Sequence, residues 1–96
     1  MLYDGAVTLE TQGDPGDQWL EGTIEPDGEL VEGAAVYVIL NGETYTGTVE
    51  NSDTGLYFYI ADGDSYVCLE DEEVFTCSMD YGSAGENTLK IIQTEE

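Results

Sequence analysis

The stretch that decides the fold is residues 34–49, which read AAVYVILNGETYTGTV. Asn41-Gly42 stands between two apolar runs, and this dipeptide is the strongest short-range signal for a β-hairpin with a two-residue turn, because both turn positions need a positive φ. Closing the turn there places the apolar side chains of both strands on one face. The pairs that it predicts are Leu40 with Glu43, Val38 with Tyr45, Ala34 with Val49, Tyr37 with Thr46 and Ile39 with Thr44.

The apolar face continues through the next two connections. A turn-rich loop follows at residues 50–55, and Gly63-Asp64 has the composition of a tight turn. A slip of one residue would move a whole strand's apolar side chains to the other face, so agreement across three successive turns favours one register. That register pairs Val49 with Leu56, Gly47 with Phe58, Tyr45 with Ile60, Ile60 with Val67 and Phe58 with Leu69.

The rest of the chain has the same character. No segment keeps a 3.6-residue apolar period, whereas short alternating runs separated by turn residues recur about every ten residues. The sequence therefore predicts an all-β fold, a small antiparallel β-sandwich or barrel of about eight short strands. The 96 residues leave room for one domain, spanning residues 1–96. We expect strands near residues 5–11, 18–25, 34–40, 43–50, 55–61, 65–70, 74–79 and 87–94.

The opposite face of the predicted sheet is rich in tyrosine. Thr46, Thr48 and Cys68 lie between the rings in this register. One interpretation is that a second sheet, made by the terminal strands, covers some of these rings. The other is an open face rimmed by carboxylates, since tyrosine is enriched at interfaces, where its ring is apolar and its hydroxyl stays hydrated. The tyrosines are Tyr37, Tyr57, Tyr59 and Tyr66.

The two cysteines lie on consecutive predicted strands. A two-residue turn at Glu72-Glu73 would place the sulfurs of Cys68 and Cys77 directly opposite each other. The apolar register disagrees, because matching Leu69 with Phe75 pairs Val67 with Cys77 and turns Cys68 to the other face. We therefore expect two free thiols, which a cytosolic compartment would keep reduced.

The charge excludes several classes of function. Twenty-two acidic residues face one lysine, with no arginine or histidine, and the net charge is −21. Such a chain cannot neutralise nucleic-acid phosphates or bind an anionic leaflet through basic residues. It has no apolar run of membrane-spanning length, and its first residues lack the basic and apolar regions of a signal peptide. We expect a cytoplasmic protein of the host cell with no direct nucleic-acid or membrane partner.

The chemistry of catalysis is also missing from the composition. Without histidine the chain lacks the commonest general base and the commonest metal ligand, and neither cysteine has a cation beside it in sequence to lower its pKa. We predict no enzymatic activity, no catalytic residue, no metal site and no cofactor. A calcium-binding module stays a minor alternative, because Asp62-Gly63-Asp64 and residues 70–73 carry the oxygen ligands that Ca²⁺ prefers, although neither matches an EF-hand loop.

The acidic residues are clustered along the chain. Residues 70–73 are four consecutive carboxylates, and five more fall within residues 21–32. A net charge of magnitude about 2–8 is enough for solubility, so this excess points to a basic target such as a nucleic-acid channel. Alternate residues on a strand lie about 6.8 Å apart, close to two phosphate steps of about 3.4 Å along duplex DNA. Matching rows would be Glu70 with Glu72, Asp71 with Glu73 and Asp62 with Asp64.

In composition and size the chain resembles the small acidic DNA-mimic inhibitors of bacteriophages and mobile elements, including anti-CRISPR and anti-restriction proteins. The resemblance covers the whole chain but no motif. It implies binding, as a monomer or homodimer, to the nucleic-acid-binding site of a basic nuclease or effector complex. The residues that we expect to contact this partner are Glu70, Asp71, Glu72, Glu73, Asp62, Asp64, Tyr37, Tyr57, Tyr59 and Tyr66, with Trp19 as a further anchor.

Other interpretations remain open at this point. The main alternative is a phage virion protein or another structural or adhesive β-sandwich module, because small β-sandwiches serve that purpose and a fold alone does not decide function. A halophilic domain would also explain an acid excess with few lysines. Affinity for basic nucleic-acid-binding proteins, self-association, and dependence on molar salt would distinguish these three.

Overall fold

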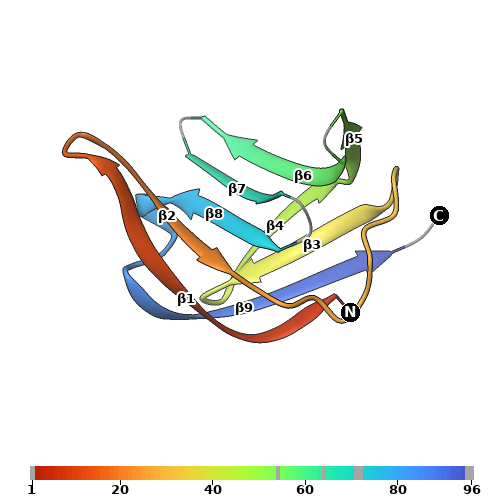
Figure 1. The fold of residues 1–96 in the computed structure, drawn as a ribbon. Coiled ribbons are helices and arrows are strands. Elements are labelled where there is room, and N and C mark those ends of the chain that lie inside the picture. The colour runs from red at the N-terminus through yellow and green to blue at the C-terminus, as the bar shows by residue number, and fades with distance from the viewer. Residues whose placement is uncertain (1, 54, 64, 71–72, 95–96) are drawn as a thin grey trace.

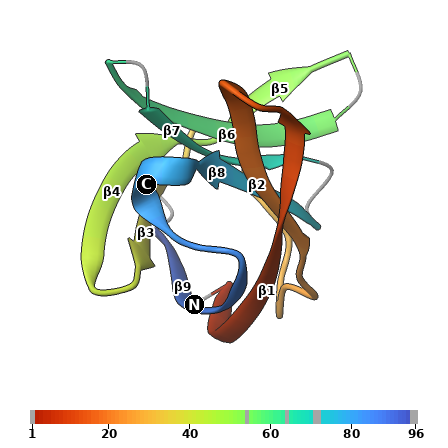
Figure 2. The same ribbon diagram turned by 90° about the vertical axis from the view of Figure 1, so that its left-hand side faces the viewer.

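The computed structural model describes residues 2–53, 55–63, 65–70 and 73–94. Within these ranges nine antiparallel strands form one sheet that curls into a nearly closed barrel (Figures 1 and 2). The predicted all-β class is confirmed. The elements are β1 (Tyr3–Asp14), β2 (Asp17–Thr23), β3 (Ala35–Leu40), β4 (Glu43–Thr48), β5 (Glu50–Ser52), β6 (Gly55–Asp62), β7 (Ser65–Glu70), β8 (Val74–Ser78), the 3₁₀ turn η1 (Met79–Tyr81) and β9 (Gly85–Thr94).

The sheet has two halves that share strand β1. Its strand order is β4-β3-β9-β1-β2-β8-β7-β6-β5. The first part of β1, up to Leu9, pairs with β9, and the part from Glu10 onward pairs with β2. At this change of partner the backbones come close: a Cβ on Gly22 of β2 would lie 2.5 Å from the carbonyl oxygen of Thr8. The barrel therefore bends at a position that tolerates no side chain.

The interior is filled by alternate residues of nearly every strand. Side chains on a strand point alternately to its two faces, so a curled sheet encloses one set and exposes the other. Phe58 and Phe75 are the largest of the fully buried side chains. The remaining core includes Val7, Leu9, Leu20, Val36, Val38, Leu40, Val67, Leu69, Cys77, Leu89 and Ile91.

The β3–β4 hairpin forms in the predicted register. Leu40 lies opposite Glu43, and the ladder continues to Ala35 opposite Thr48. Asn41 and Gly42 have φ angles of 52° and 91°, the positive values that a two-residue hairpin turn of type I′ requires. Beyond the strands, the Val49 amide donates a hydrogen bond to the Ala34 carbonyl over 2.9 Å, so these two residues also meet as predicted.

The predicted pairing of residues 43–49 with β6 is wrong. A short strand that the sequence did not indicate, β5, pairs with β6 instead, and it places Asn51 opposite Leu56. The register differs from the predicted one by two residues, an even number, so the same side chains still face the core. Strand β4 stays bonded to β3 and meets β6 through side chains, closely enough that a Cβ on Gly47 would lie 2.5 Å from Cγ1 of Ile60.

The β6–β7–β8 meander follows the predicted register. Phe58 lies opposite Leu69, Ile60 opposite Val67, and Val67 opposite Cys77. Cys68 and Cys77 consequently lie on opposite faces of the sheet, and both are free and buried. Asp64, in the predicted turn between β6 and β7, lies outside the described residues.

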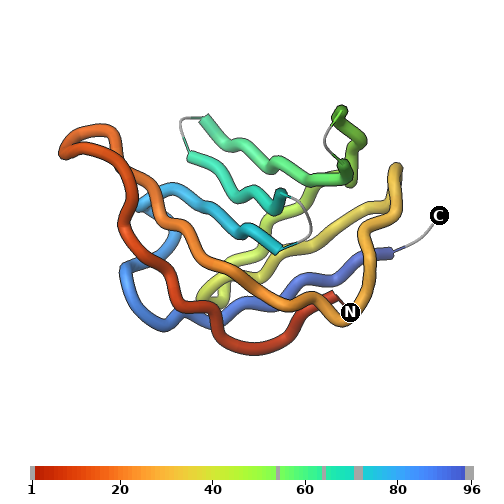
Figure 3. The backbone as a smooth tube through the Cα atoms, viewed as in Figure 1, coloured from red at the N-terminus to blue at the C-terminus, as the bar shows by residue number. Residues whose placement is uncertain are grey.

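The β1–β2 hairpin is longer than predicted. The strands reach Asp14 and Asp17, joined by Pro15-Gly16, and Gly16 has a φ of 91°. The end of this hairpin extends beyond the barrel wall, as the tube in Figure 3 shows at the upper left. Strand β9 also begins two residues earlier than expected, at Gly85. The described residues include no helix that is long and apolar enough to cross a membrane.

Candidate functional site

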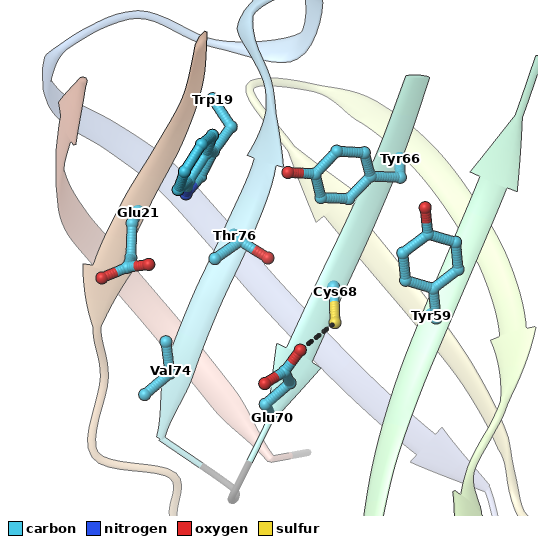
Figure 4. A pocket seen from close by; sticks show the side chains of 8 residues that line it. All are labelled: Trp19, Glu21, Tyr59, Tyr66, Cys68, Glu70, Val74 and Thr76. Atoms are coloured by element: carbon cyan, nitrogen blue, oxygen red, sulfur yellow. Dashed lines mark hydrogen bonds between the residues drawn. The ribbon is translucent and has the colours of Figure 1, made fainter. Parts of the chain in front are cut away.

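An open groove lies on the outer face of the sheet, across strands β2, β8, β7 and β6 (Figure 4). Its volume is about 440 Å³, within the range of ligand-binding clefts. We call it the aromatic groove. The residues that line it are Trp19 and Glu21 of β2, Val74 and Thr76 of β8, Tyr66, Cys68 and Glu70 of β7, and Tyr59 of β6.

The strand register brings these side chains together. Glu21 lies opposite Thr76, and Thr76 lies opposite Cys68 on the other side of β8. Cys68 in turn lies opposite Tyr59. Because directly opposite residues of antiparallel strands point to the same face, these four form one row across the outside of the barrel. The core residues Leu20, Phe75, Val67 and Phe58 alternate with the groove residues and fix which face is outward.

The groove has aromatic walls and a low floor. Trp19 on β2 and Tyr66 on β7 lie on either side of Thr76 (Figure 4). Strand β8 lies between β2 and β7, so the backbones of these two strands are about 10 Å apart, which is twice the spacing of neighbouring strands. Ser78 lies opposite Trp19 and is buried, and its Oγ accepts a 2.8 Å hydrogen bond from the Tyr66 amide. The side chains of β8 therefore form a low floor between Trp19 and Tyr66, and the Tyr66 hydroxyl points across this floor toward Trp19 (Figure 4).

One wall is a stacked pair of tyrosines. The rings of Tyr59 and Tyr66 have centroids 5.4 Å apart and planes 11° from parallel. Tyr59 is the outer member, with 52% of its surface exposed. Burial, with Tyr59 and nearby acidic groups as smaller causes, raises the pKa of Tyr66 above its ordinary value. The Tyr66 hydroxyl is therefore neutral at physiological pH and available as both donor and acceptor.

The thiol in the groove is unreactive. Cys68 donates a 3.8 Å hydrogen bond from its sulfur to the Glu70 carboxylate, drawn as a dashed line in Figure 4. Burial and then the charge of Glu70 raise the pKa of Cys68 to about 11, and burial raises the pKa of Cys77 in the core to about 11. Both thiols are protonated at neutral pH, so neither is a nucleophile there.

Carboxylates border the groove on two sides. Glu21 and Glu70 line it directly. Glu10 on β1 lies opposite Glu21 of β2. On the other side, Tyr57 of β6 lies between Glu70 of β7 and Glu50 of β5, opposite both of them. Glu10, Glu50 and Glu70 are exposed, and Glu21 is half-buried. None of the described residues that line the groove is basic, so the negative potential of this face has no cation to offset it.

Three of the predicted partner-binding residues lie together in the groove, namely Tyr59, Tyr66 and Glu70. Tyr57 lies on the same outer face, two residues along β6 from Tyr59. Tyr37 does not join them: it lies on β3 in the other half of the barrel, opposite Thr46 and Ile92, and is 39% exposed. The sequence register describes a flat sheet, whereas closure of the barrel separates β3 from β6.

Asp62 also lies apart from Glu70. The two residues are at opposite ends of the β6–β7 hairpin, because Asp62 pairs with Ser65 and Glu70 pairs with Tyr57. The charge of Asp62 instead adds a minor increment to the pKa of Tyr45, which burial raises first. The ring of Tyr45 packs against the ring of Tyr81, with the two ring centroids 4.6 Å apart.

Glu73 does not extend β7. Its amide donates a 3.2 Å hydrogen bond to the carbonyl of Glu70, which forms a turn after that strand. Each predicted row of alternate carboxylates along residues 70–73 includes Asp71 or Glu72, so the described residues do not test its spacing. Asp71 and Glu72, like Asp64, lie outside the described residues.

Sequence reasoning missed half of the groove. Trp19 was expected only as a further anchor, and Glu21, Val74 and Thr76 were not expected at the site at all. The signal for β2 was present, because a buried Leu20 turns both Trp19 and Glu21 outward. The pairing of β2 with β8 joins residues more than fifty positions apart, and no turn between them sets its register.

No group of three or more Cys, Asp or Glu side chains in the described residues is placed to hold a metal ion. Comparisons of the chain with protein-family models, with curated proteins and with solved structures give no significant match.

Proposed function

We propose that this protein is an acidic inhibitor that binds the nucleic-acid-binding site of a DNA- or RNA-binding effector in the host cytoplasm, for example a CRISPR or restriction nuclease, by electrostatic mimicry of DNA. The aromatic groove and its carboxylates would contact the partner. The single observation that carries the proposal is an open aromatic surface bordered by Glu10, Glu21, Glu50 and Glu70, with no basic side chain among the described residues that line it.

The energetics of association support this assignment. Aromatic side chains and arginine dominate binding hot spots, and this chain has no arginine, so its anchors must be aromatic. Every described Asp and Glu is exposed apart from the half-buried Glu21. Exposed charge of one sign steers an oppositely charged partner into contact and suppresses binding to acidic ones. A nucleic-acid-binding site is the cationic surface that such a face fits best.

The test is displacement of nucleic acid from purified effectors. A fluorescent DNA duplex is bound to a restriction nuclease or a CRISPR effector, and its anisotropy is followed as the acidic protein is added. We expect displacement at about 50 mM NaCl that weakens steeply as salt increases, since the contacts are ionic. A panel of effectors that shows no displacement at low salt would contradict the proposal.

Two charge-matched variants show where the partner binds. The groove variant carries Glu21→Gln, Glu50→Gln and Glu70→Gln. The control carries Glu29→Gln, Glu32→Gln and Glu86→Gln, three exposed residues outside β2, β5, β6, β7 and β8. We expect the concentration of protein needed to displace half of the DNA to be at least tenfold higher for the groove variant than for the control. Equal losses would indicate that net charge alone acts. Self-association or binding to capsid proteins without displacement would favour a virion module instead.

A further inference from the structure

The aromatic groove matches one particular group of a basic partner. We propose that it receives an arginine side chain, whose guanidinium lies between Trp19 and Tyr66 and is held by the carboxylates of Glu21 and Glu70. For the identity of the partner this inference rests on the proposed function; for the groove itself it rests on the geometry of the described residues.

All polar side chains of the groove except the Trp19 indole N–H, which only donates, can accept hydrogen bonds from a ligand. Glu21 and Glu70 are acceptors, and the hydroxyls of Thr76, Tyr59 and Tyr66 can all accept. A guanidinium has five N–H donors and no acceptor, so each of its N–H groups can find a hydrogen-bond acceptor in the groove. In Figure 4 the Tyr66 hydroxyl points across the floor toward Trp19, which places an acceptor in the middle of the groove.

The shape favours a flat group. Trp19 and Tyr66 stand on strands about 10 Å apart with side chains of β8 between them, and the Tyr66 hydroxyl reaches into this space (Figure 4), so a group that enters it beside the Trp19 ring must be flat. Guanidinium stacks on aromatic faces and is weakly hydrated, and tryptophan is the best aromatic partner for a cation. A lysine ammonium is compact and strongly hydrated, so it uses the rings less well.

Charge complementarity selects the same occupant. Glu21 borders the groove on the β2 side and Glu70 at the end of β7, so a cation in the groove meets a carboxylate from two strands (Figure 4). Arginine also binds carboxylates through two parallel hydrogen bonds, which gives it a geometric advantage over lysine at equal charge. The site therefore discriminates by geometry as well as by sign.

The experiment uses two peptide probes and the intrinsic fluorescence of the protein. Trp19 is the only tryptophan of the chain, so its emission reports on the groove directly. Hexa-arginine and hexalysine peptides, equal in charge, are titrated into the full chain at about 150 mM NaCl. We expect hexa-arginine to bind at least fivefold more tightly and to change the Trp19 emission. Equal affinity of the two peptides would overturn the inference.

Matched variants locate the binding. Tyr66→Leu is expected to weaken hexa-arginine binding about tenfold and to leave hexalysine binding within twofold, whereas Glu70→Gln removes a charge that attracts both peptides and is expected to weaken hexa-arginine binding more than hexalysine binding. Glu86→Gln and Tyr37→Leu make the same chemical changes on the outer face of the other half, and both residues are exposed. These controls should bind hexa-arginine as the unmodified chain does, and a thermal melt checks that every variant is folded. Equal weakening by controls and groove variants would overturn the inference.

The two proposals can fail separately. Arginine-selective binding in the groove together with no displacement of DNA from any effector would contradict the proposed function and retain the arginine site. Displacement of DNA with no preference for hexa-arginine, and no effect of Tyr66→Leu, would retain the proposed function and overturn the arginine site.

Discussion

The two thiols are the residues whose protonation the fold changes most clearly. Burial raises the pKa of both Cys68 and Cys77 to about 11 from the ordinary value of 9.0. Between these pH values the unfolded chain loses protons that the folded chain keeps. The free energy of unfolding must therefore fall as pH rises from about 9 to 11. We expect a loss of roughly 1–2 kcal/mol for each thiol, after allowance for partial screening by solvent.

Urea unfolding at several pH values between 8 and 11, with a reducing agent present, measures this loss. The control is the double variant Cys68→Ala with Cys77→Ala. It is less stable at every pH because Cys77 lies in the core, but its stability should decline less steeply with pH. Tyr45 and Tyr66, whose pKa values burial also raises, remain in both proteins, so most of the difference in slope belongs to the thiols and a smaller part to the charge that the thiolates place near these tyrosines. Identical slopes would mean that the thiols titrate alike in both states.

At the scale of elements, the β1–β2 hairpin positions Trp19. Gly13 has a φ of 87°, and a Cβ there would collide with the Asp17 carbonyl and lie 2.8 Å from the Trp19 ring. We expect Gly13→Ala to destabilise the protein by about 1–3 kcal/mol, to shift the Trp19 emission and to weaken hexa-arginine binding. Fluorescence spectra and urea unfolding of the same sample test all three effects.

Gly16 supplies the matched control for this prediction. It lies in the same hairpin with a φ of 91°, but nothing lies within 4 Å of the Cβ that it would gain. Gly16→Ala therefore carries the backbone strain without the collision. We expect this variant to lower the free energy of unfolding by about 1 kcal/mol and to leave the Trp19 emission unchanged. If the two variants shift the emission equally, the ring does not depend on the space beside Gly13.

Local signals made the hairpins predictable from the sequence. Asn41-Gly42 specified its turn, and the apolar alternation of residues 55–77 specified the register from Phe58 to Cys77. The junctions between hairpins were not predictable in the same way. The change of partner along β1 and the corner after β4 depend on how the barrel closes, which is set by nonlocal packing such as Gly22 against Thr8.

The candidate site divides along the same line. Tyr59, Tyr66 and Glu70 belong to one locally paired hairpin, so sequence reasoning placed them together correctly. Trp19 comes from a strand that joins β8 only through long-range pairing. Tyr37 was assigned to the same face because alternation determines which side of a sheet a residue takes, but not how far the sheet curves between two residues. The groove is thus a property of the closed barrel.

At the scale of the whole molecule, repulsion among carboxylates should limit stability. The net charge is −21, and the molecule measures 40 × 27 × 21 Å. At 10 mM salt the Debye length is about 30 Å, so most of these charges repel one another across the whole fold. At 300 mM it is below about 8 Å, and only close neighbours such as Glu10 and Glu21, directly opposite on paired strands, still interact strongly.

We therefore expect the melting temperature to rise between 10 and 300 mM NaCl, by several degrees for each kcal/mol of repulsion that salt removes. The groove variant with Glu21→Gln, Glu50→Gln and Glu70→Gln should melt higher than the unmodified chain at 10 mM, and the difference should shrink at 300 mM. Sucrose at equal osmolality controls for general solute effects. A melting temperature that stays flat over this range would mean that the carboxylates are too far apart to act together, and the negative face would then lack the strength to draw in a cationic partner. A fold that forms only in molar salt would instead indicate a halophilic domain.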